Sequence, residues 1–317
     1  MQNSTKLKQA DVFEQASFRG VMSTHLIFPF CTAKIIKMKV VVTGASGLLG
    51  RATAQQFKNA GHHVVGTALS RSKDNLIKLD LTDSAAVESF LKEQKPDVLV
   101  HCAAERRPDV AERDRDAVLR LNVETPRNLG KICKDAEIML IYISTDYVFD
   151  GTSPPYEVED KPNPLNFYGQ TKLDGEEAIM GACPEAVILR VPILYGCTEY
   201  NGESAINVLI DVVLNHGKAA LVDNVASRYP TNVEDVGRVL KDLAAEESVT
   251  KYQVCEIIGA ILNVPIDHLT PQNTVDKSAS VSRPEDSHLS NKRLQANGID
   301  TNCVKLATWF AKNLTPM

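Results

Sequence analysis

The feature that most constrains the fold is the segment TGASGLLG at residues 43–50, which lies between an apolar run and an amphipathic stretch. The apolar run, 38–42, predicts a buried β-strand, and the amphipathic stretch to about Ala60 predicts a helix. A glycine-rich turn at such a junction lets backbone N–H groups approach a pyrophosphate, whose charge the start of a helix favours. We therefore predict a dinucleotide-binding turn formed by Gly44, Ser46, Gly47, Leu48, Leu49 and Gly50.

Strand-like and helix-like segments alternate along the chain as far as residue 191. Apolar runs predict strands, and the amphipathic stretches between them, such as 85–94 and 110–136, predict helices. Further strands are predicted at 62–69, 76–81, 96–104, 137–144 and 185–191. Strands that alternate with helices are typical of a parallel sheet covered on both faces. We therefore predict an α/β fold with a Rossmann-type doubly wound parallel sheet.

The same pattern predicts how the chain is divided. Residues 38–192 are expected to form the dinucleotide-binding Rossmann domain. Helix-like segments dominate residues 193–317, which are expected to form a smaller C-terminal α/β subdomain interleaved with the first. Residues 1–37 contain a short apolar run, LIFPFC, that is interrupted by Pro29. We expect these residues to be a disordered N-terminal extension rather than a secretory signal, with a transit peptide as the alternative.

Composition and charge exclude several classes of function. The net charge of -5 supplies no basic surface for nucleic acid or for a membrane. No apolar stretch is long enough to cross a bilayer. The seven cysteines are scattered without a CxxC pair, and no His/Cys cluster has the spacing of metal ligands. We therefore expect reduced thiols, no metal site and a location in the cytoplasm, with the nucleus as a further location.

The charges after the second predicted strand indicate which dinucleotide binds. In NAD-binding folds an acidic residue about 20 positions past the glycine turn takes the ribose 2′-hydroxyl. No Asp or Glu occurs from Arg51 to Lys73, and Arg71 follows the second strand instead. A cation here suits the 2′-phosphate of NADP, so NADP(H) is favoured over NAD(H), with Arg51 as a second candidate cation. The alternative is that both arginines are solvated surface charges.

Small and polar residues follow the third and fourth predicted strands, at the edge of the sheet where a crevice is expected. Asp80 and Leu81 come where the adenine would lie, although an ordinary surface loop explains them nearly as well. Small side chains end the fourth strand and would let a cofactor lie close: Cys102, Ala103 and Ala104. Arg106 and Arg107 follow, and either bind an anionic ligand at the mouth of the crevice or form a surface pair.

A tyrosine and a lysine four residues apart provide a candidate proton-handling pair. Tyr168 and Lys172 share one face of a predicted helix. The helix follows a strand that ends with Ser144 and Thr145, whose hydroxyls are expected at the same rim. A phenol has a pKa near 10 in water, and a neighbouring ammonium stabilises its anion. We therefore predict that Thr145, Tyr168 and Lys172 act together beside a nicotinamide ribose.

These motifs, in this order, resemble the extended short-chain dehydrogenase/reductase superfamily. The segments STDYVFDG (144–151) and RYPTNVEDV (228–236) are similar to its dTDP-4-dehydrorhamnose reductase branch. The segment HCAAERRPDVAE (101–112) is most similar to one offshoot of that branch, the regulatory beta subunits of methionine adenosyltransferase. The resemblance extends from Met38 to the C-terminus and is strongest through residue 210.

The resemblance implies roles for particular residues. It assigns the pyrophosphate to the three glycines of the turn, the 2′-phosphate to Arg51 and Arg71, and the adenine to Asp80 and Leu81. Pro192, in the segment LRVPILYG, is implied as a further cofactor contact. The residues implied as substrate or partner contacts are Arg106, Arg107 and Arg228.

The resemblance also implies a function. Members of the regulatory offshoot bind NADP, associate with the catalytic subunit of methionine adenosyltransferase and adjust its response to methionine, with no accepted reaction of their own. The alternative is an NADPH-dependent reductase of a nucleotide 4-keto-6-deoxy sugar, in which Thr145, Tyr168 and Lys172 deliver the proton. A third reading is an NADP-sensing scaffold with another partner.

The chain departs from the family pattern at two places. A strand that family members carry is missing near 246–249, where four residues link two predicted helices. We therefore expect an incomplete sugar-nucleotide pocket. The regulatory branch docks through a tail beyond the last helix, and the short stretch after Trp309 and Phe310 predicts weaker docking.

Overall fold

A computed structural model describes residues 38–70, 75–239, 250–273, 289 and 306–314. Three features predicted from the sequence lie outside these residues: the N-terminal extension 1–37, the cation Arg71 and the link at 246–249. Among the described residues no helix is long and apolar enough to cross a membrane. The described cysteines are free thiols: Cys102, Cys133, Cys183, Cys197 and Cys255.

A six-stranded sheet with every strand parallel forms the centre of the fold, in the order β3-β2-β1-β4-β5-β6. Its strands are β1 (Lys39–Thr43), β2 (His63–Ala68), β3 (Ile77–Lys78), β4 (Val98–His101), β5 (Met139–Thr145) and β6 (Val187–Val191). After β3 the chain crosses to the other side of β1, so the strand order reverses between β1 and β4. The predicted Rossmann-type doubly wound sheet is confirmed, and ligands of such sheets bind at this reversal.

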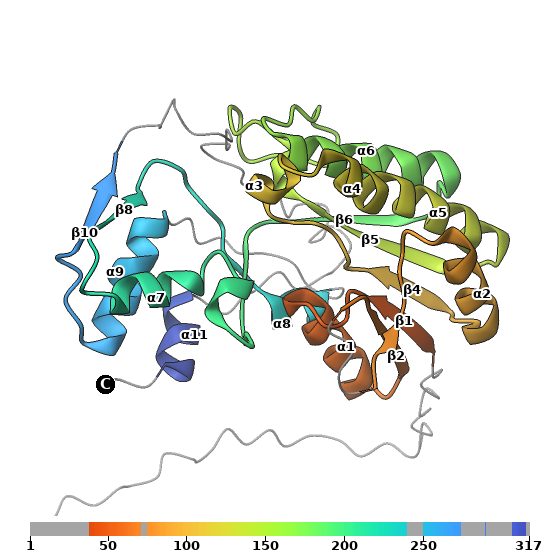
Figure 1. Cartoon of the computed structure of the whole chain (residues 1–317), viewed down its shortest axis with the longest axis horizontal. Coiled ribbons are helices and arrows are strands. Elements are labelled where there is room, and N and C mark those ends of the chain that lie inside the picture. The colour runs from red at the N-terminus through yellow and green to blue at the C-terminus, as the bar shows by residue number, and fades with distance from the viewer. Residues whose placement is uncertain (1–37, 71–74, 240–249, 274–288, 290–305, 315–317) are drawn as a thin grey trace, which may run out of the picture. The chain divides into compact units, whose positions relative to one another are not determined.

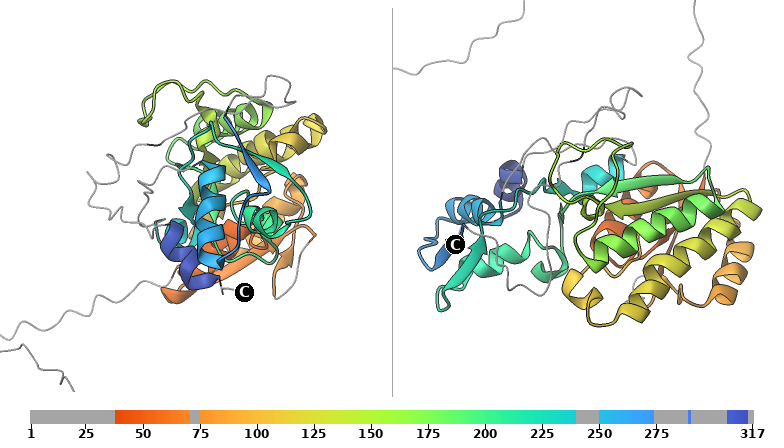
Figure 2. Two further views of the ribbon diagram at one scale, coloured as in Figure 1. Left: turned by 90° about the vertical axis from the view of Figure 1, so that its left-hand side faces the viewer. Right: turned by 90° about the horizontal axis from the view of Figure 1, so that it is seen from above.

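Helices cover both faces of the sheet (Figure 1). On one face α2 (Ser84–Gln94), α5 (Thr125–Asp135) and α6 (Phe167–Ala182) pack on a core that includes Leu99 and Leu140. On the other face α1 (Leu48–Asn59) and α8 (Val233–Val239) pack on the opposite sides of β1 and β4. Seen from above, α5 and α6 lie side by side along the sheet (Figure 2).

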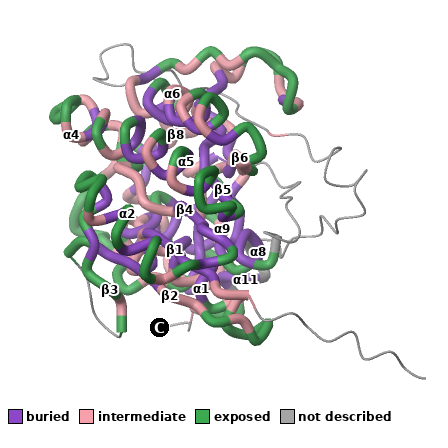
Figure 3. The backbone as a smooth tube through the Cα atoms, turned by 90° about the vertical axis from the view of Figure 1, so that its right-hand side faces the viewer, coloured by how far each residue is buried: buried purple, intermediate pink, exposed green. Residues whose placement is uncertain are grey.

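The central strands are buried on both faces, which explains their continuous apolar sequences. Val40, Val41 and Val42 of β1 are all fully buried, and β4 is buried along its whole length. β5 is buried except at its first residue, Met139. Figure 3 shows buried backbone in the middle of this part of the chain and exposed backbone at its outside. A strand buried on both faces has no polar face, so its sequence does not alternate. The core therefore holds the carboxyl ends of the central strands in fixed positions.

The region 110–136, predicted as one helical stretch, is broken in the structure. It contains α3 (Pro108–Ala111), α4 (Arg115–Leu119), the π-helix η1 (Arg120–Glu124) and α5. Asp114 starts α4 afresh, because its side chain accepts a hydrogen bond from Ala117 N at 3.2 Å. In η1 the buried Asn122 accepts from Glu105 N and donates to Glu105 O, both at 3.0 Å. The π-turn therefore anchors the loop that follows β4.

Beyond β6 the chain forms a second core. Figure 1 shows α7 (Val208–Leu214), α9 (Lys251–Leu262) and α11 (Leu306–Asn313) gathered beside the strands β8 (Ala220–Asp223) and β10 (Leu269–Gln272). Tyr195, Trp309 and Phe310 form an aromatic cluster within it. A capping box of Thr250 and Gln253 starts α9, which ends at Asn263 in the left-handed conformation. The sequence analysis found helix-like segments here, and the structure has the helices α7, α9 and α11 in this part of the chain.

The sequence prediction missed the short strands of this part of the chain. β8 and β10 form a parallel pair, and β7 (Leu194–Tyr195) pairs with β9 (Thr231–Asn232). Pro271 lies within β10 and argues against a strand on local grounds. These strands exist because a distant segment pairs with them, which a local pattern does not reveal.

Candidate functional site

A cavity of about 840 Å³ lies at the carboxyl ends of the central strands. This volume is within the range of small-molecule sites, roughly 300–1,000 Å³. Sixteen of the lining residues follow β1, β2, β3, β4 or β5 directly or belong to their last positions: Gly44, Ser46, Gly47, Thr67, Ala68, Leu69, Ser70, Leu79, Asp80, Leu81, Cys102, Ala103, Ala104, Ser144, Thr145 and Asp146. The cavity thus occupies the place where the strand order reverses.

The glycine turn is shaped so that only hydrogen atoms fit at two of its positions. Gly44 has φ +64°, and an added Cβ would lie 2.9 Å from the Cα of Ala103. An added Cβ at Gly50 would lie 2.8 Å from the Cα of Ala45 and would clash with the Gly44 carbonyl. Side chains are therefore excluded where the turn approaches the end of β4 and the start of α1.

The start of α1 suits an anion. Gly47 is its N-cap residue and has no side chain to cap the helix, and the first turn contains no acidic residue. The first backbone N–H groups of a helix have no intrahelical acceptor, and the helix dipole favours a negative charge there. Ser46, Gly47, Leu48, Leu49 and Gly50 all line the cavity, as do Gly44 and the small residues after β4. The predicted pyrophosphate turn and the cavity therefore coincide.

The lining residues that follow β2 and β3 are largely apolar. They include Leu69, Leu79 and Leu81, and Leu69 is 56% exposed. Asp80 accepts hydrogen bonds from Thr82 N at 2.9 Å and Thr82 Oγ1 at 2.7 Å, which lower the pKa of its carboxyl group. Apolar walls with a carboxylate at the edge suit a flat, polar-edged ring such as adenine.

Helix α6 presents its tyrosine and lysine to the cavity. Asn166 caps the helix by accepting from Gly169 N at 2.9 Å. Gly169 allows the helix to start close to the end of β5, since an added Cβ would clash with the Tyr147 carbonyl. Tyr168 and Lys172, one turn apart, both line the cavity together with Thr145. The structure therefore brings the three predicted residues of this group to one wall.

Lys172 is buried and faces the sheet. Its Nζ donates to the Ile143 carbonyl at 2.7 Å and lies 3.9 Å from the centre of the Tyr142 ring. Burial lowers the pKa of Lys172 to about 7. Burial also raises the pKa of Tyr168, so its phenol is protonated through the neutral range. The wall thus offers a phenol that donates a hydrogen bond and an amine near the middle of its titration.

The predicted arginines occupy different environments. Arg106 and Arg107 are exposed and line the cavity, and Arg107 forms a two-bond ion pair with Glu105, with Nε–Oε1 at 2.9 Å and Nη2–Oε2 at 2.8 Å. Arg228 is 1% exposed, is not part of the lining, and donates to Ser227 O at 2.9 Å. Its role as a substrate or partner contact stays a prediction.

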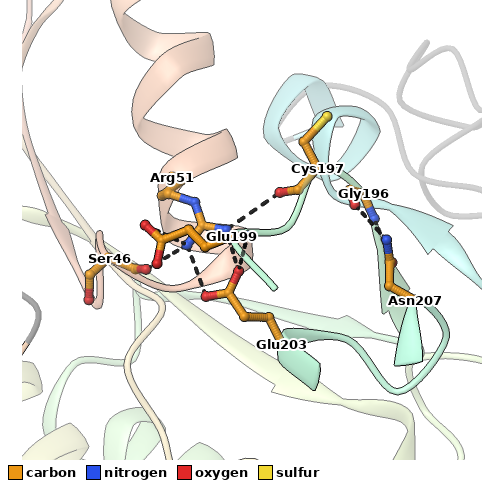
Figure 4. Close-up of polar contacts among 7 residues, drawn as sticks. All are labelled: Ser46, Arg51, Gly196, Cys197, Glu199, Glu203 and Asn207. Carbon is orange, nitrogen blue, oxygen red and sulfur yellow. Dashed lines mark hydrogen bonds and ion pairs between the residues drawn. The ribbon is translucent and has the colours of Figure 1, made fainter. Parts of the chain in front are cut away.

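Arg51 is not part of the lining either, although it lies next to the glycine turn. Its guanidinium pairs with the buried carboxylate of Glu203 and donates to the Ser46 carbonyl (Figure 4). Its predicted contact with a 2′-phosphate stays a prediction. The second predicted cation, Arg71, lies outside the described residues.

Several lining residues were not predicted from the sequence. They include Leu69, Leu79, Thr82, Arg120, Pro108, Asp109, Glu203, Ser204 and Lys251. The leucines sit beside predicted strand ends and could have been found from that position. Glu203, Ser204 and Lys251 come from segments that carry no local motif, so only the fold brings them to the cavity. Pro192, which was predicted, is also part of the lining.

A parallel sheet with this strand order, and a glycine turn at the cavity where the order reverses, defines the Rossmann-type class of proteins. Residues 38–309 match the family model described as RmlD substrate binding domain. Methionine adenosyltransferase 2 subunit beta from Danio rerio is 40% identical over 294 residues, which cover 88% of this chain and 90% of the relative. The chain belongs to the RmlD substrate-binding-domain family and, within it, to the methionine adenosyltransferase 2 subunit beta family.

Solved structures show the same fold. A dTDP-4-dehydrorhamnose reductase from Clostridium acetobutylicum has a TM-score of 0.76 and 27% identity, and covers 87% of this chain and 98% of its own. A dTDP-4-dehydrorhamnose reductase from Bacillus anthracis in complex with NADP also has a TM-score of 0.76, with 24% identity, and covers 87% of this chain and 97% of its own. The predicted resemblance to the reductase branch and to its regulatory offshoot is confirmed.

Proposed function

We propose that this protein is an NADP-binding, non-catalytic regulatory subunit of methionine adenosyltransferase, which modulates the synthesis of S-adenosylmethionine in the cytoplasm. The proposal is carried by one observation: a chain of the subunit beta family has a cavity lined by a glycine-rich turn where the strand order reverses. The curated relatives are named as beta subunits of methionine adenosyltransferase 2, and a beta subunit implies a catalytic partner. The partner proposed here is the catalytic subunit of methionine adenosyltransferase from the same organism.

Different residues of the cavity would contact different parts of the dinucleotide. The turn with Gly44, Gly47 and Gly50 would hold the diphosphate, because its backbone comes close without side chains. The lining at Asp80 and Leu81 would hold the adenine, and Cys102, Ala103, Ala104 and Pro192 would lie along the remainder of the dinucleotide. A bound nicotinamide supplies the capacity for hydride transfer. The proposal requires only that the chain bind it.

Tyr168 and Lys172 would have a role even in a protein that binds the dinucleotide without catalysing a reaction. Tyr168 is half-buried at the cavity wall and keeps its proton, so it would donate a hydrogen bond to the nicotinamide ribose. Lys172, one helical turn away, would add a second donor from the same wall. Their presence therefore favours dinucleotide binding and does not by itself demonstrate turnover.

The test is co-purification with the catalytic subunit of the same organism. The proposal expects the two chains to co-elute in size-exclusion chromatography, and expects the dependence of S-adenosylmethionine synthesis on methionine to change when this protein is added. Both measurements are made with and without NADPH. Separate elution together with an unchanged methionine dependence would end the proposal.

A second candidate function is an NADPH-dependent reductase of a nucleotide 4-keto-6-deoxy sugar. The observation that favours it is the assembly of Thr145, Tyr168 and Lys172 on one cavity wall. In this function Tyr168 would pass its proton to the substrate oxygen, with Thr145 positioning that oxygen. The raised pKa of Tyr168 means that the phenol starts in its protonated form, as an acid requires.

Tyr168→Phe distinguishes the two functions. The regulatory proposal expects no oxidation of NADPH above background by the wild type with a dTDP-4-keto-6-deoxy sugar, followed at the nicotinamide absorbance. The reductase function expects turnover that Tyr168→Phe lowers by about 100-fold or more, because the general acid is lost. Turnover at equal rates in both proteins would contradict the proposed role of Tyr168. Tyr252→Phe, which removes a phenol on α9 at a residue that is not part of the cavity lining, is the matched control.

A further inference from the structure

The Arg51 side chain joins two parts of the chain that are 152 positions apart in sequence. Arg51 lies in the first turns of α1, directly after the glycine turn. Its Nη1 donates to Glu203 Oε1 at 3.1 Å and its Nη2 to Glu203 Oε2 at 2.6 Å. Glu203 belongs to η3 (Asn201–Glu203) and its side chain is only 2% exposed. Figure 4 shows the two side chains meeting end to end.

The same guanidinium also binds two backbone carbonyls. Nη1 donates to Ser46 O at 2.7 Å, within the glycine turn, and Nη2 donates to Cys197 O at 3.4 Å (Figure 4). Each terminal nitrogen of a guanidinium carries two N–H groups, and each of these nitrogens has two acceptors here. The N–H groups on Nη1 and Nη2 of Arg51 therefore all have acceptors within the protein.

The segment that carries Glu203 is itself held in place. Ser204 Oγ donates to Leu194 O at 2.7 Å, and Asn207 Nδ2 donates to Gly196 O at 3.0 Å. Glu203 Oε2 accepts from Glu199 N at 2.9 Å as well. Glu203, Ser204 and Leu194 all line the cavity. A shift of this segment would therefore change the part of the cavity wall that these residues form beside the glycine turn.

We propose that Arg51 is a positioning residue whose pairing with Glu203 ties the 194–207 segment to the glycine turn, and that it sets the affinity for NADPH and NADH alike. The inference rests on the proposed dinucleotide function. It assigns Arg51 a role other than binding the 2′-phosphate. Recruiting Arg51 to a phosphate would leave the buried carboxylate of Glu203 without its cation, which is costly.

Affinities for the two dinucleotides separate these roles. Arg51→Gln and Glu203→Gln are each expected to weaken binding of NADPH and of NADH by the same factor, about tenfold, because the cavity wall and the turn lose their shared anchor. The ratio of the two dissociation constants stays at its wild-type value. The double variant is no weaker than the weaker single variant, because one interaction is lost in all three.

Binding of the 2′-phosphate by Arg51 predicts the opposite pattern. Arg51→Gln would then weaken the binding of NADPH and leave the binding of NADH unchanged. Glu203→Gln would tighten the binding of NADPH, because it frees the guanidinium of Arg51. Either result would overturn the inference. Glu199→Gln is the matched control: its carboxylate lies 3.9 Å from Arg51 and is 54% exposed, so its removal is expected to change neither dissociation constant.

Thermal unfolding without nucleotide supplies an independent readout. Each single variant is expected to lower Tm by roughly 5 °C, and the double variant by no more than either. Additive losses would contradict the pairing. If Arg51→Gln does not fold, Arg51→Lys replaces it in both experiments. Arg51→Lys is expected to raise the dissociation constants of NADPH and NADH by the same factor. If the wild type binds neither dinucleotide, the proposed function is refuted. The Tm values of the single and double variants would still decide whether the Arg51–Glu203 pair ties the two segments together.

Discussion

Replacing Gly50 with alanine is expected to weaken NADPH binding by about 100-fold or more, because the turn that would hold the diphosphate has no room for a methyl group. The added carbon would clash with the Gly44 carbonyl and lie 2.8 Å from the Cα of Ala45. Neither neighbour is a flexible side chain, so the turn itself must move. The dissociation constant from isothermal titration calorimetry measures the effect.

The Gly50→Ala result needs a control for general destabilisation. Gly181→Ala places a methyl group on α6, where nothing lies within 4 Å, and alanine favours a helix. We expect it to bind NADPH like the wild type. Circular dichroism at the temperature of the titration establishes that Gly50→Ala is folded. A folded Gly50→Ala protein with wild-type affinity would show that the diphosphate does not lie over this turn.

Replacing Lys172 with methionine is expected to stabilise the protein at pH 6 by about 1–2 kcal/mol, while weakening dinucleotide binding. Lys172 is 2% exposed, and burial lowers its pKa from 10.5 to about 7. Below pH 7 the lysine is charged in both the folded and the unfolded chain, so the full cost of burying the charge is present. We expect this desolvation cost to exceed the stabilisation that the ammonium gains from its contacts with the Ile143 carbonyl and the Tyr142 ring.

The stability advantage of Lys172→Met is expected to shrink as the pH rises. Between about pH 7 and 10.5 the unfolded chain holds a proton on this lysine that the folded chain has released, so wild-type stability increases with pH. The methionine variant lacks this slope, and the two curves converge. Urea unfolding at pH 6 and pH 9 measures the difference.

Lys92→Met is the matched control for Lys172→Met. Lys92 is 71% exposed and pairs with Glu88 on the surface of α2, so its removal is expected to change stability little at either pH. A loss of stability in Lys172→Met at pH 6 would show that the contacts of the ammonium outweigh its desolvation. The account of Lys172 as a residue kept for binding at the expense of stability would then be wrong.

The sheet and the dinucleotide turn could be predicted from the sequence because their causes are local. Doubly buried strands are continuous apolar runs, and the glycine turn needs particular residues at particular positions. Residues at strand ends, such as Ala103, Asp80 and Thr145, could be placed at one rim, since parallel strands all end on the same side. Tyr168 and Lys172 followed from their spacing on a helix.

What could not be predicted depends on distant partners. Arg51 has the charge and position of a phosphate ligand, and only the fold reveals Glu203 beside it. The strands β8 and β10 exist by pairing with one another, and β10 contains a proline. The π-turn that aims Asn122 at the loop after β4 has no sequence signature of its own.

Calorimetric titration of NADPH into the purified chain tests the central claim most directly. The account predicts a single site per chain, with NADPH bound more tightly than NADH and with NADPH binding weakened about 100-fold or more in Gly50→Ala. Titration at two temperatures guards against a binding enthalpy that happens to be near zero at one of them. No heat at either temperature with up to about 1 mM NADPH would mean that the cavity is not a dinucleotide site.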